Sequence, residues 1–361
     1  MKILCVIDSL GAGGAQRQIV QLAIGFKKRG HEVSFLTYHL LEFFKPQLEE
    51  NSIPIKTIVE PNYFKRLFRI RKEVRNHNAD VVLSFLEATN FMVTLAGIPA
   101  KPWKLVVGER NAKPQILKSL KLILFRNFHI FADKVIANSF HNVHLIRKVN
   151  PFTHSNKFKV IYNGLDLNEW QPRVSPEQIS SSKKIMVASR HRKHKNLLGL
   201  VEAVNLLSKQ EQEQLIIEWY GSKRDESFNE GLVKIKQYNL EHVFHFFDNT
   251  PNVLEKMQNA DAIGLFSLYE GLPNSICEGM AVGKPIISTD VSDAKNLVTP
   301  QNGFLCDATS EKSIAYAISQ FLRTDSNTLN KMGVKSRKIA EKLFDREKVI
   351  NDYLEVFKKL K

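Results

Sequence analysis

The sequence predicts an α/β protein of two domains that face each other, each a parallel sheet covered by helices. A chain of 361 residues is too long for one ordinary α/β domain and fits two. Short runs rich in Val, Ile and Phe alternate with helical stretches along the whole chain, which is typical of parallel sheets. A composition of 43% hydrophobic and 25% charged residues excludes a largely disordered chain.

The first domain is expected over residues 1–168. Its predicted strands are Ile3–Ile7, Glu32–Thr37, Asp80–Ser84, Lys104–Val107, Lys134–Ala137 and Lys159–Ile161. A helix is predicted over Ala15–Arg29, and Gly30 closes it because glycine accepts the left-handed conformation found after helix ends. Residues 168–182 turn polar, contain two prolines and three consecutive serines, and are expected to link the domains.

The same alternation restarts in a second domain, expected over residues 183–345. Its predicted elements are strands at Lys184–Ala188, Leu215–Tyr220, Val243–Phe247, Ala262–Ser267 and Pro285–Thr289 and a helix at Asn196–Leu207. Residues 346–361 form an amphipathic helix whose apolar face carries Val349, Tyr353, Val356 and Phe357.

The cysteines and the N-terminus indicate the compartment. Cys5, Cys277 and Cys306 lack the spacing of a metal site or a disulfide framework, which favours a reducing environment. The apolar N-terminus has only a strand's length and no cleavage site, so it is expected to be a buried strand. No run approaches the roughly 18–20 apolar residues of a spanning helix. The protein is expected to be cytoplasmic, or to lie on a membrane without crossing it.

The strongest site signal follows the predicted strand Ala262–Ser267. Glu270 lies in a tight turn, Asn274 or Ser275 is expected to cap the next helix, and Glu278 lies about one turn into it. Ligands of open α/β sheets bind beyond the carboxyl ends of strands, and a helix N-terminus suits a diphosphate. The two carboxylates would then hold sugar and ribose hydroxyls. From the residues alone, two solvated glutamates are an equal alternative.

Two further loops follow strands. Arg190 and Lys195 flank a strand-to-helix turn and could bracket a diphosphate leaving group; a solvated basic face or a nucleic-acid patch is the alternative. The glycine-rich loop at residues 11–14 lets an anion approach the backbone closely. Dinucleotide binding is its alternative, but the full G-x-G-x-x-G pattern is missing. Arg110, at the end of a strand, either holds phosphate or acceptor hydroxyls or forms a structural ion pair.

Glu270 and Glu278, with the Gly-Leu-Pro-Asn turn between them and Gly-Lys-Pro after them, resemble the Glu-x7-Glu signature of retaining family 4 glycosyltransferases. The resemblance extends from Gly13 to the final helix. It implies the GT-B fold, two facing Rossmann-like domains with a cleft between them, and a final helix that crosses back to the first domain. It also implies that Glu270 faces the transferred sugar, Glu278 holds the ribose, and Arg190 and Lys195 bind the diphosphate.

The resemblance implies a donor site and a small catalytic set. The donor-binding residues are Gly13, Gly14, Arg190, Lys195, Phe247, Asp248, Glu270, Gly271, Leu272, Pro273, Asn274, Ser275 and Glu278. The catalytic residues are Glu270, Arg190, Lys195 and Arg110. Three positions depart from the family: Gln16 replaces a Glu, Arg110 stands where relatives often have His, and Asp248 replaces a Gly beside the base.

The implied reaction is transfer of a sugar from a UDP- or GDP-sugar to a lipid-linked saccharide, lipopolysaccharide or other polysaccharide precursor. The resemblance implies no cofactor and no metal, because cationic side chains do the work of a metal ion. The alternatives are a sugar-nucleotide epimerase of the same architecture and an inactive donor-binding subunit. An epimerase usually carries a different carboxylate and histidine set.

The positive charge is concentrated in the first domain. The whole chain has a net charge of +15, and residues 101–150 hold ten basic and two acidic residues. A basic face mixed with Leu and Phe predicts a helix that lies on an anionic membrane, on the cytoplasmic face of the inner membrane. The residues predicted at this membrane or acceptor surface are Lys118, Lys121, Leu122, Phe125 and Arg126. A core helix with a solvated basic edge is the alternative; nucleic acid is not expected as a partner.

Overall fold

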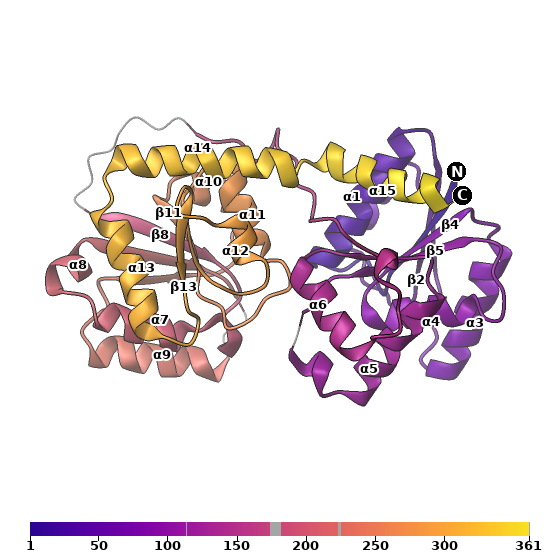
Figure 1. Cartoon of the computed structure of the whole chain (residues 1–361), viewed down its shortest axis with the longest axis horizontal. Coiled ribbons are helices and arrows are strands. Elements are labelled where there is room, and N and C mark those ends of the chain that lie inside the picture. The colour runs from indigo at the N-terminus through magenta and orange to yellow at the C-terminus, as the bar shows by residue number, and fades with distance from the viewer. Residues whose placement is uncertain (113, 174–181, 223–224, 361) are drawn as a thin grey trace. The chain divides into compact units, whose positions relative to one another are not determined.

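The computed structural model describes residues 1–112, 114–173, 182–222 and 225–360 (Figure 1). The chain divides into two compact units: Met1–Gly164 with Arg346–Lys361, and Leu165–Asp345. The second unit therefore begins inside the range expected for the first domain. The predicted linker, residues 168–182, lies partly outside the described residues.

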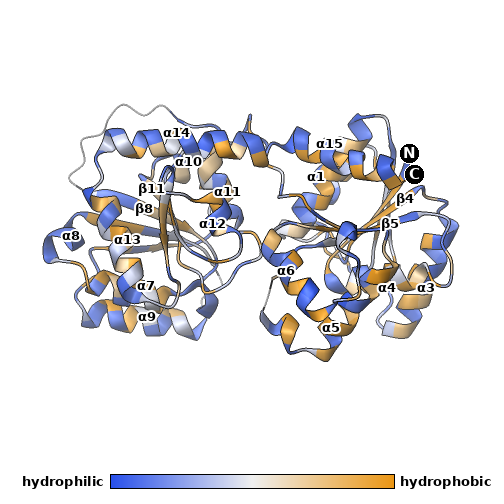
Figure 2. Cartoon of the chain, in the orientation of Figure 1, coloured by the Kyte–Doolittle hydropathy of each residue, from blue (hydrophilic) through white to orange (hydrophobic). Residues whose placement is uncertain are grey.

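The first unit is built on a parallel sheet with strand order β3-β2-β1-β4-β5-β6-β7 in the described residues. Its strands are β1 Lys2–Val6, β2 Glu32–Thr37, β3 Ile55–Thr57, β4 Val81–Phe85, β5 Lys104–Glu109, β6 Lys134–Ala137 and β7 Phe158–Val160. Its α-helices are α1 Gly14–Lys28, α2 Lys45–Glu50, α3 Tyr63–Asn76, α4 Glu87–Ala96, α5 Leu120–Asn127, α6 Phe140–Val149 and α15 Arg346–Leu360. Figure 2 shows apolar residues along β4 and β5, as expected for strands covered on both faces.

The C-terminal helix α15 belongs to the core of this unit. Tyr353 and Phe357 are buried, and their rings lie 6.5 and 5.5 Å from the ring of Phe26 on α1. Gly25 lets the two helices approach, because a side chain there would overlap Ile350. The predicted apolar face of the final helix is confirmed.

The second unit is built on a parallel sheet with strand order β10-β9-β8-β11-β12-β13 in the described residues. Its strands are β8 Lys183–Ala188, β9 Leu215–Tyr220, β10 Phe244–Phe247, β11 Ala262–Leu265, β12 Ile286–Thr289 and β13 Gly303–Cys306. Its α-helices are α7 Leu197–Asn205, α8 Lys209–Glu213, α9 Glu226–Gln237, α10 Val253–Gln258, α11 Asn274–Ala281, α12 Ala294–Leu297, α13 Glu311–Arg323 and α14 Ser326–Leu343.

Each sheet has one point where the strand order reverses. In the first unit, β2 and β3 lie on one side of β1, and β4 to β7 lie on its other side. In the second unit, β9 and β10 lie on one side of β8, and β11 to β13 lie on its other side. The loops that leave the carboxyl ends of such neighbouring strands diverge and open a crevice, which is where ligands of α/β sheets bind. Three of the predicted site loops follow β1, β8 and β11.

Two other findings concern the cysteines and the helices. Cys5, Cys277 and Cys306 are buried and form no disulfide, and burial raises the pKa of the Cys306 thiol to about 12. None of the described helices combines the length and the apolar character needed to span a membrane.

Candidate active site

The second unit brings Glu270 and Lys195 together. The Glu270 carboxylate oxygen Oε1 lies 2.5 Å from Lys195 Nζ and accepts a hydrogen bond of 2.7 Å from Ser267 Oγ. The side chains of Lys195 and Glu270 are only 17% and 13% exposed. A largely shielded ion pair is screened less by solvent than a surface pair, so the two charges fix each other's position.

The loops after β8 and β11 are also joined through their backbones. The Leu268 amide donates a hydrogen bond of 2.8 Å to the carbonyl of His194. The rings of His194 and Tyr269 are stacked, with centroids 4.9 Å apart. Burial and the neighbouring Lys195 lower the pKa of His194, which favours the neutral ring at pH 7. The two loops therefore form one continuous surface.

The end of β12 and the loop that follows it support the Glu270 turn. Thr289 Oγ1 donates a hydrogen bond of 2.7 Å to the carbonyl of Ser267, and Ser292 Oγ donates to the carbonyl of Gly271. Ser292 has a positive φ of 55°, a conformation that is costly for a residue with a side chain. Its bond to Gly271 offsets that cost and fixes the turn.

Glu278 lies one turn into α11 and is 8% exposed. The helix packs closely on β11, because a side chain at Gly279 would come within 2.6 Å of Ile263. The prediction that Asn274 or Ser275 caps this helix is wrong. Pro273 occupies the cap position and Asn274 is the first helical residue, so the first turn lacks a side-chain cap.

Arg190 and Lys195 bracket the turn after β8. Arg190 is exposed and follows the strand by two residues. Asn196 adopts a left-handed conformation with φ of 64°, and its side-chain amide donates to the carbonyl of Ala308 at 3.1 Å. This bend ends the basic loop and starts α7 at Leu197.

Phe247 and Asp248 lie at the same edge of this sheet, at the end of β10, and both are exposed. The Phe247 ring is stacked on Tyr220 of β9, with centroids 4.7 Å apart. Burial and the carboxylate of Glu218 raise the pKa of Tyr220 to about 12, so its hydroxyl stays protonated. Phe247 therefore presents an exposed aromatic ring at the end of β10, two strands from β8.

In the first unit, Gly13 and Gly14 lie where α1 begins after β1. Gln16 Nε2 donates a hydrogen bond of 3.0 Å to Asp8 Oδ1, and any side chain at Gly13 would overlap Gln16. Gln16, which replaces the family's Glu, therefore packs against the loop instead of presenting a charge.

Arg110 is held by partners within the first unit. It donates to Asn163 Oδ1 at 3.0 Å and to the hydroxyl of Tyr353, and its guanidinium lies 4.1 Å from the centroid of the Phe85 ring. These contacts tie the end of β5 to α15. The partners are an amide, a phenol and a phenyl ring, and a role for Arg110 at the site stays a prediction.

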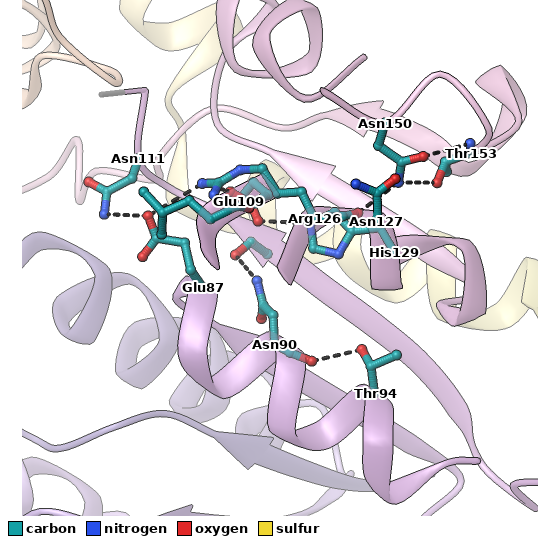
Figure 3. Close-up of polar contacts among 12 residues, drawn as sticks. Glu87, Asn90, Thr94, Glu109, Asn111, Arg126, Asn127, His129, Asn150 and Thr153 are labelled. Atoms are coloured by element: carbon teal, nitrogen blue, oxygen red, sulfur yellow. Dashed lines mark hydrogen bonds and ion pairs between the residues drawn. The ribbon is translucent and has the colours of Figure 1, made fainter. Parts of the chain in front are cut away.

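A buried ionic cluster lies at the end of β5 (Figure 3). Arg126 Nη2 lies 3.0 Å from Glu109 Oε2 and 3.3 Å from Glu87 Oε1, and His129 Nε2 lies 2.8 Å from Glu109 Oε1. Burial alone would raise the pKa of Glu109, but Arg126 and His129 outweigh burial and hold that pKa below its ordinary value. Glu109 therefore stays ionised.

This cluster corrects the predicted membrane surface. Arg126 is 0% exposed and Phe125 is 5% exposed, so neither belongs to an outward face. Lys118 and Lys121 are exposed, and Leu122 is half-buried. The helical periodicity of the sequence distinguishes the faces of α5. It does not show that the carboxylate of Glu109 lies beneath this helix.

Sequence reasoning missed Glu87, the first residue of α4 after β4. Its Oε1 accepts hydrogen bonds from Asn111 Nδ2 at 3.1 Å and from Arg126. The signal for it in the sequence was its position directly after β4, an inner strand at the point where the strand order of the sheet reverses. It links the buried cluster to the loop that follows β5.

Two family descriptions match consecutive parts of the chain. Residues 12–169 match "Glycosyltransferase Family 4", and residues 170–339 match "Glycosyl transferases group 1". A Campylobacter jejuni protein described as N-acetylgalactosamine-N,N'-diacetylbacillosaminyl-diphospho-undecaprenol 4-alpha-N-acetylgalactosaminyltransferase is 27% identical over 98% of both chains. Another C. jejuni protein, described as a GalNAc-alpha-(1->4)-GalNAc-alpha-(1->3)-diNAcBac-PP-undecaprenol alpha-1,4-N-acetyl-D-galactosaminyltransferase, is 25% identical over 90% of both.

Solved structures share the fold. The crystal structure of Anabaena HepE in complex with UDP superposes with a TM-score of 0.85 at 20% identity, over 99% of this chain and 100% of that one. The lipopolysaccharide outer core galactosyltransferase WaaB gives a TM-score of 0.79 at 16% identity, over 99% of both chains. The expected GT-B fold with Rossmann-like domains is confirmed. The chain belongs to the family 4 glycosyltransferases and is a glycosyltransferase.

Proposed function

We propose that this enzyme transfers a sugar from a UDP- or GDP-sugar to a lipid-linked saccharide, with retention of configuration, on the cytoplasmic face of the inner membrane. The donor half of the proposal rests on the ion pair between Lys195 and Glu270 at the carboxyl edge of the second sheet, and on the exposed Arg190 in the same loop as Lys195. Support for the acceptor comes from the two C. jejuni relatives, whose descriptions name diphospho- or PP-undecaprenol acceptors.

The ion pair prepares the site for a dianionic ligand. Lys195 balances the charge of Glu270 across their ion pair. When the donor binds, its diphosphate competes for Lys195 and Arg190, and Glu270 is released to accept a hydrogen bond from a sugar hydroxyl. Negative charge then grows on the diphosphate as the glycosidic bond breaks, and the two cations stabilise it in place of a metal ion.

A thermal-shift screen against nucleotide sugars tests the donor class. A true donor at 100 times its Kd stabilises the folded state by about 2.7 kcal/mol, whereas a sugar nucleotide that does not bind has no effect. We expect stabilisation by a UDP- or GDP-sugar and by the matching nucleoside diphosphate. Stabilisation by neither series would contradict the proposed donor.

Replacing Glu278 separates nucleotide binding from transfer. We expect Glu278→Gln to raise the Kd of the free nucleoside diphosphate roughly 10- to 100-fold, because a hydrogen bond to a charged group is worth about 1.5–3 kcal/mol. Glu270→Gln is expected to leave that Kd nearly unchanged and to reduce transfer.

Calorimetry with the bare nucleotide measures this difference, and Glu230→Gln on the exposed face of α9 is the control. Unchanged unfolding temperatures show that the variants are folded. Equal losses of nucleotide affinity in both site variants would contradict the division of roles.

A further inference from the structure

The first unit carries an apolar groove between α3, α4 and α5. Its volume is about 400 Å³, and it is lined by Tyr63, Phe64, Leu67, Phe91, Leu95, Lys121, Leu124 and Phe125. The stacked rings of Phe91 and Phe125 form part of its wall, with centroids 4.4 Å apart. In Figure 1, α4 lies between α3 and α5, and both of these helices pack against it.

Large apolar side chains of α3 and α5 are exposed, and two of them, Phe64 and Leu124, line this groove. Phe64 and Phe68 on α3 are 71% and 68% exposed, and Leu120 and Leu124 on α5 are 84% and 51% exposed. Each pair is spaced by four residues, so each forms a stripe along its own helix. Figure 2 shows apolar residues along α5. Scattered exposed apolar residues are ordinary, but a contiguous group around an apolar groove marks an interaction surface.

Two arginines and two lysines of α3 point in different directions. Arg71 and Arg75 turn inward and donate to backbone carbonyls of Leu95 and Ala100 at 2.6 and 2.8 Å. Lys65 and Lys72 are exposed, and Lys72 continues the stripe of Phe64 and Phe68 by four more residues. The inward arginines serve the fold, and the outward lysines are available to a partner.

Lysines border the α5 side as well. Lys118 and Lys121 are exposed, and Lys121 Nζ lies 5.6 Å from the centroid of the Phe125 ring at the groove. Exposed aromatic and aliphatic side chains framed by lysines match two features of a bilayer surface, its apolar interior and its anionic headgroups. A soluble acidic saccharide would use the lysines and leave the apolar stripes without a partner.

We propose that the α3–α5 surface (Phe64, Phe68, Leu120 and Leu124 with Lys65, Lys72, Lys118 and Lys121) docks on an anionic lipid bilayer. The proposal rests on the proposed lipid-linked acceptor, which requires the enzyme to work at a membrane. Because α3 and α5 are separated by more than 40 residues of sequence, the helical period of α5 alone gave only part of this surface.

Co-sedimentation of the full chain with lipid vesicles tests the proposal. Wild type is expected to bind phosphatidylglycerol vesicles, to lose binding as salt rises, and to bind phosphatidylcholine vesicles weakly. Changing Lys65, Lys72, Lys118 and Lys121 to Gln is expected to lower partition onto phosphatidylglycerol by roughly 100-fold or more. The matched control changes four exposed lysines of the second unit, Lys236, Lys312, Lys331 and Lys335, to Gln.

The apolar part is tested separately. Phe64→Ser with Leu120→Ser is expected to lower partition about tenfold or more, whereas Phe152→Ser with Val233→Ser, which removes two exposed apolar side chains elsewhere, is expected to leave it unchanged. The proposal would be overturned by equal partition on both lipids, or by surface variants that bind vesicles as well as their controls do. Either result would favour a soluble acidic partner for the exposed lysines.

Nucleoside diphosphate binding is measured on the same proteins. Unchanged unfolding temperatures show that the surface variants are folded. If the wild-type protein binds nucleoside diphosphate but does not bind vesicles, the membrane surface is refuted and the proposed donor still stands. Vesicle binding without any nucleotide binding would refute the proposed donor and leave the membrane surface standing.

Discussion

Replacing Lys195 with Ala is expected to lower kcat/KM by roughly 10²- to 10³-fold, equivalent to about 2.7–4 kcal/mol of transition-state stabilisation. Lys195 has two tasks in the proposed reaction. It stabilises charge on the departing diphosphate, and it balances the charge of Glu270 at 2.5 Å. Without it, an unpaired carboxylate faces an incoming dianion. Steady-state kinetics with the donor identified by thermal shift measure the effect.

A second lysine–glutamate pair in the same unit is the matched control. Lys184 Nζ lies 2.6 Å from Glu218 Oε1, near the amino end of β8 and away from the site loops. Lys184→Ala is expected to keep kcat/KM within about twofold of wild type, since Lys184 lies at the amino end of β8, opposite the carboxyl edge that carries the site loops. Similar kinetics for Lys195→Ala and Lys184→Ala would refute the assigned role.

The sequence predicted the strands well because parallel strands are continuous apolar runs. The bounds predicted at Glu32–Thr37, Lys134–Ala137 and Leu215–Tyr220 coincide with β2, β6 and β9. It missed β3, Ile55–Thr57, and β13, Gly303–Cys306, which lie at the edges of their sheets. These two strands are short, with three residues in β3 and four in β13.

The residues of the candidate site could be predicted from the sequence, but the contacts between them could not. Glu270 and Lys195 each follow a strand, which is visible in the sequence. Their ion pair depends on β8 and β11 being neighbours, although the two residues are 75 positions apart. The periodicity of apolar residues along the sequence does not show which strands are neighbours in the sheet. For the same reason Arg126 was placed on the surface, since its partner Glu109 comes from β5.

The buried cluster gives the largest expected effect on stability. We expect Arg126→Met to lower the free energy of unfolding by about 3–5 kcal/mol, because it leaves the carboxylate of Glu109 buried without its main counter-ion. For a unit of this size the loss corresponds to roughly 10 °C in Tm. Thermal and denaturant unfolding measure it. The control is Arg147→Met, which removes an exposed arginine from the last turn of α6.

The pH dependence distinguishes loss of the counter-ion from loss of packing. The pKa of Glu109 is lowered in the folded state, so the unfolded chain binds a proton more readily, and the free energy of unfolding rises with pH between the two pKa values. This contribution is fully present above the unfolded pKa, about 4.5, and is lost as the pH falls through the folded pKa. Arg126→Met removes a principal force that lowers the pKa, so the deficit relative to wild type is expected to be largest near neutral pH and to shrink in acid. A deficit that stays constant between neutral and acidic pH would show that Arg126 acts through packing and not through its charge.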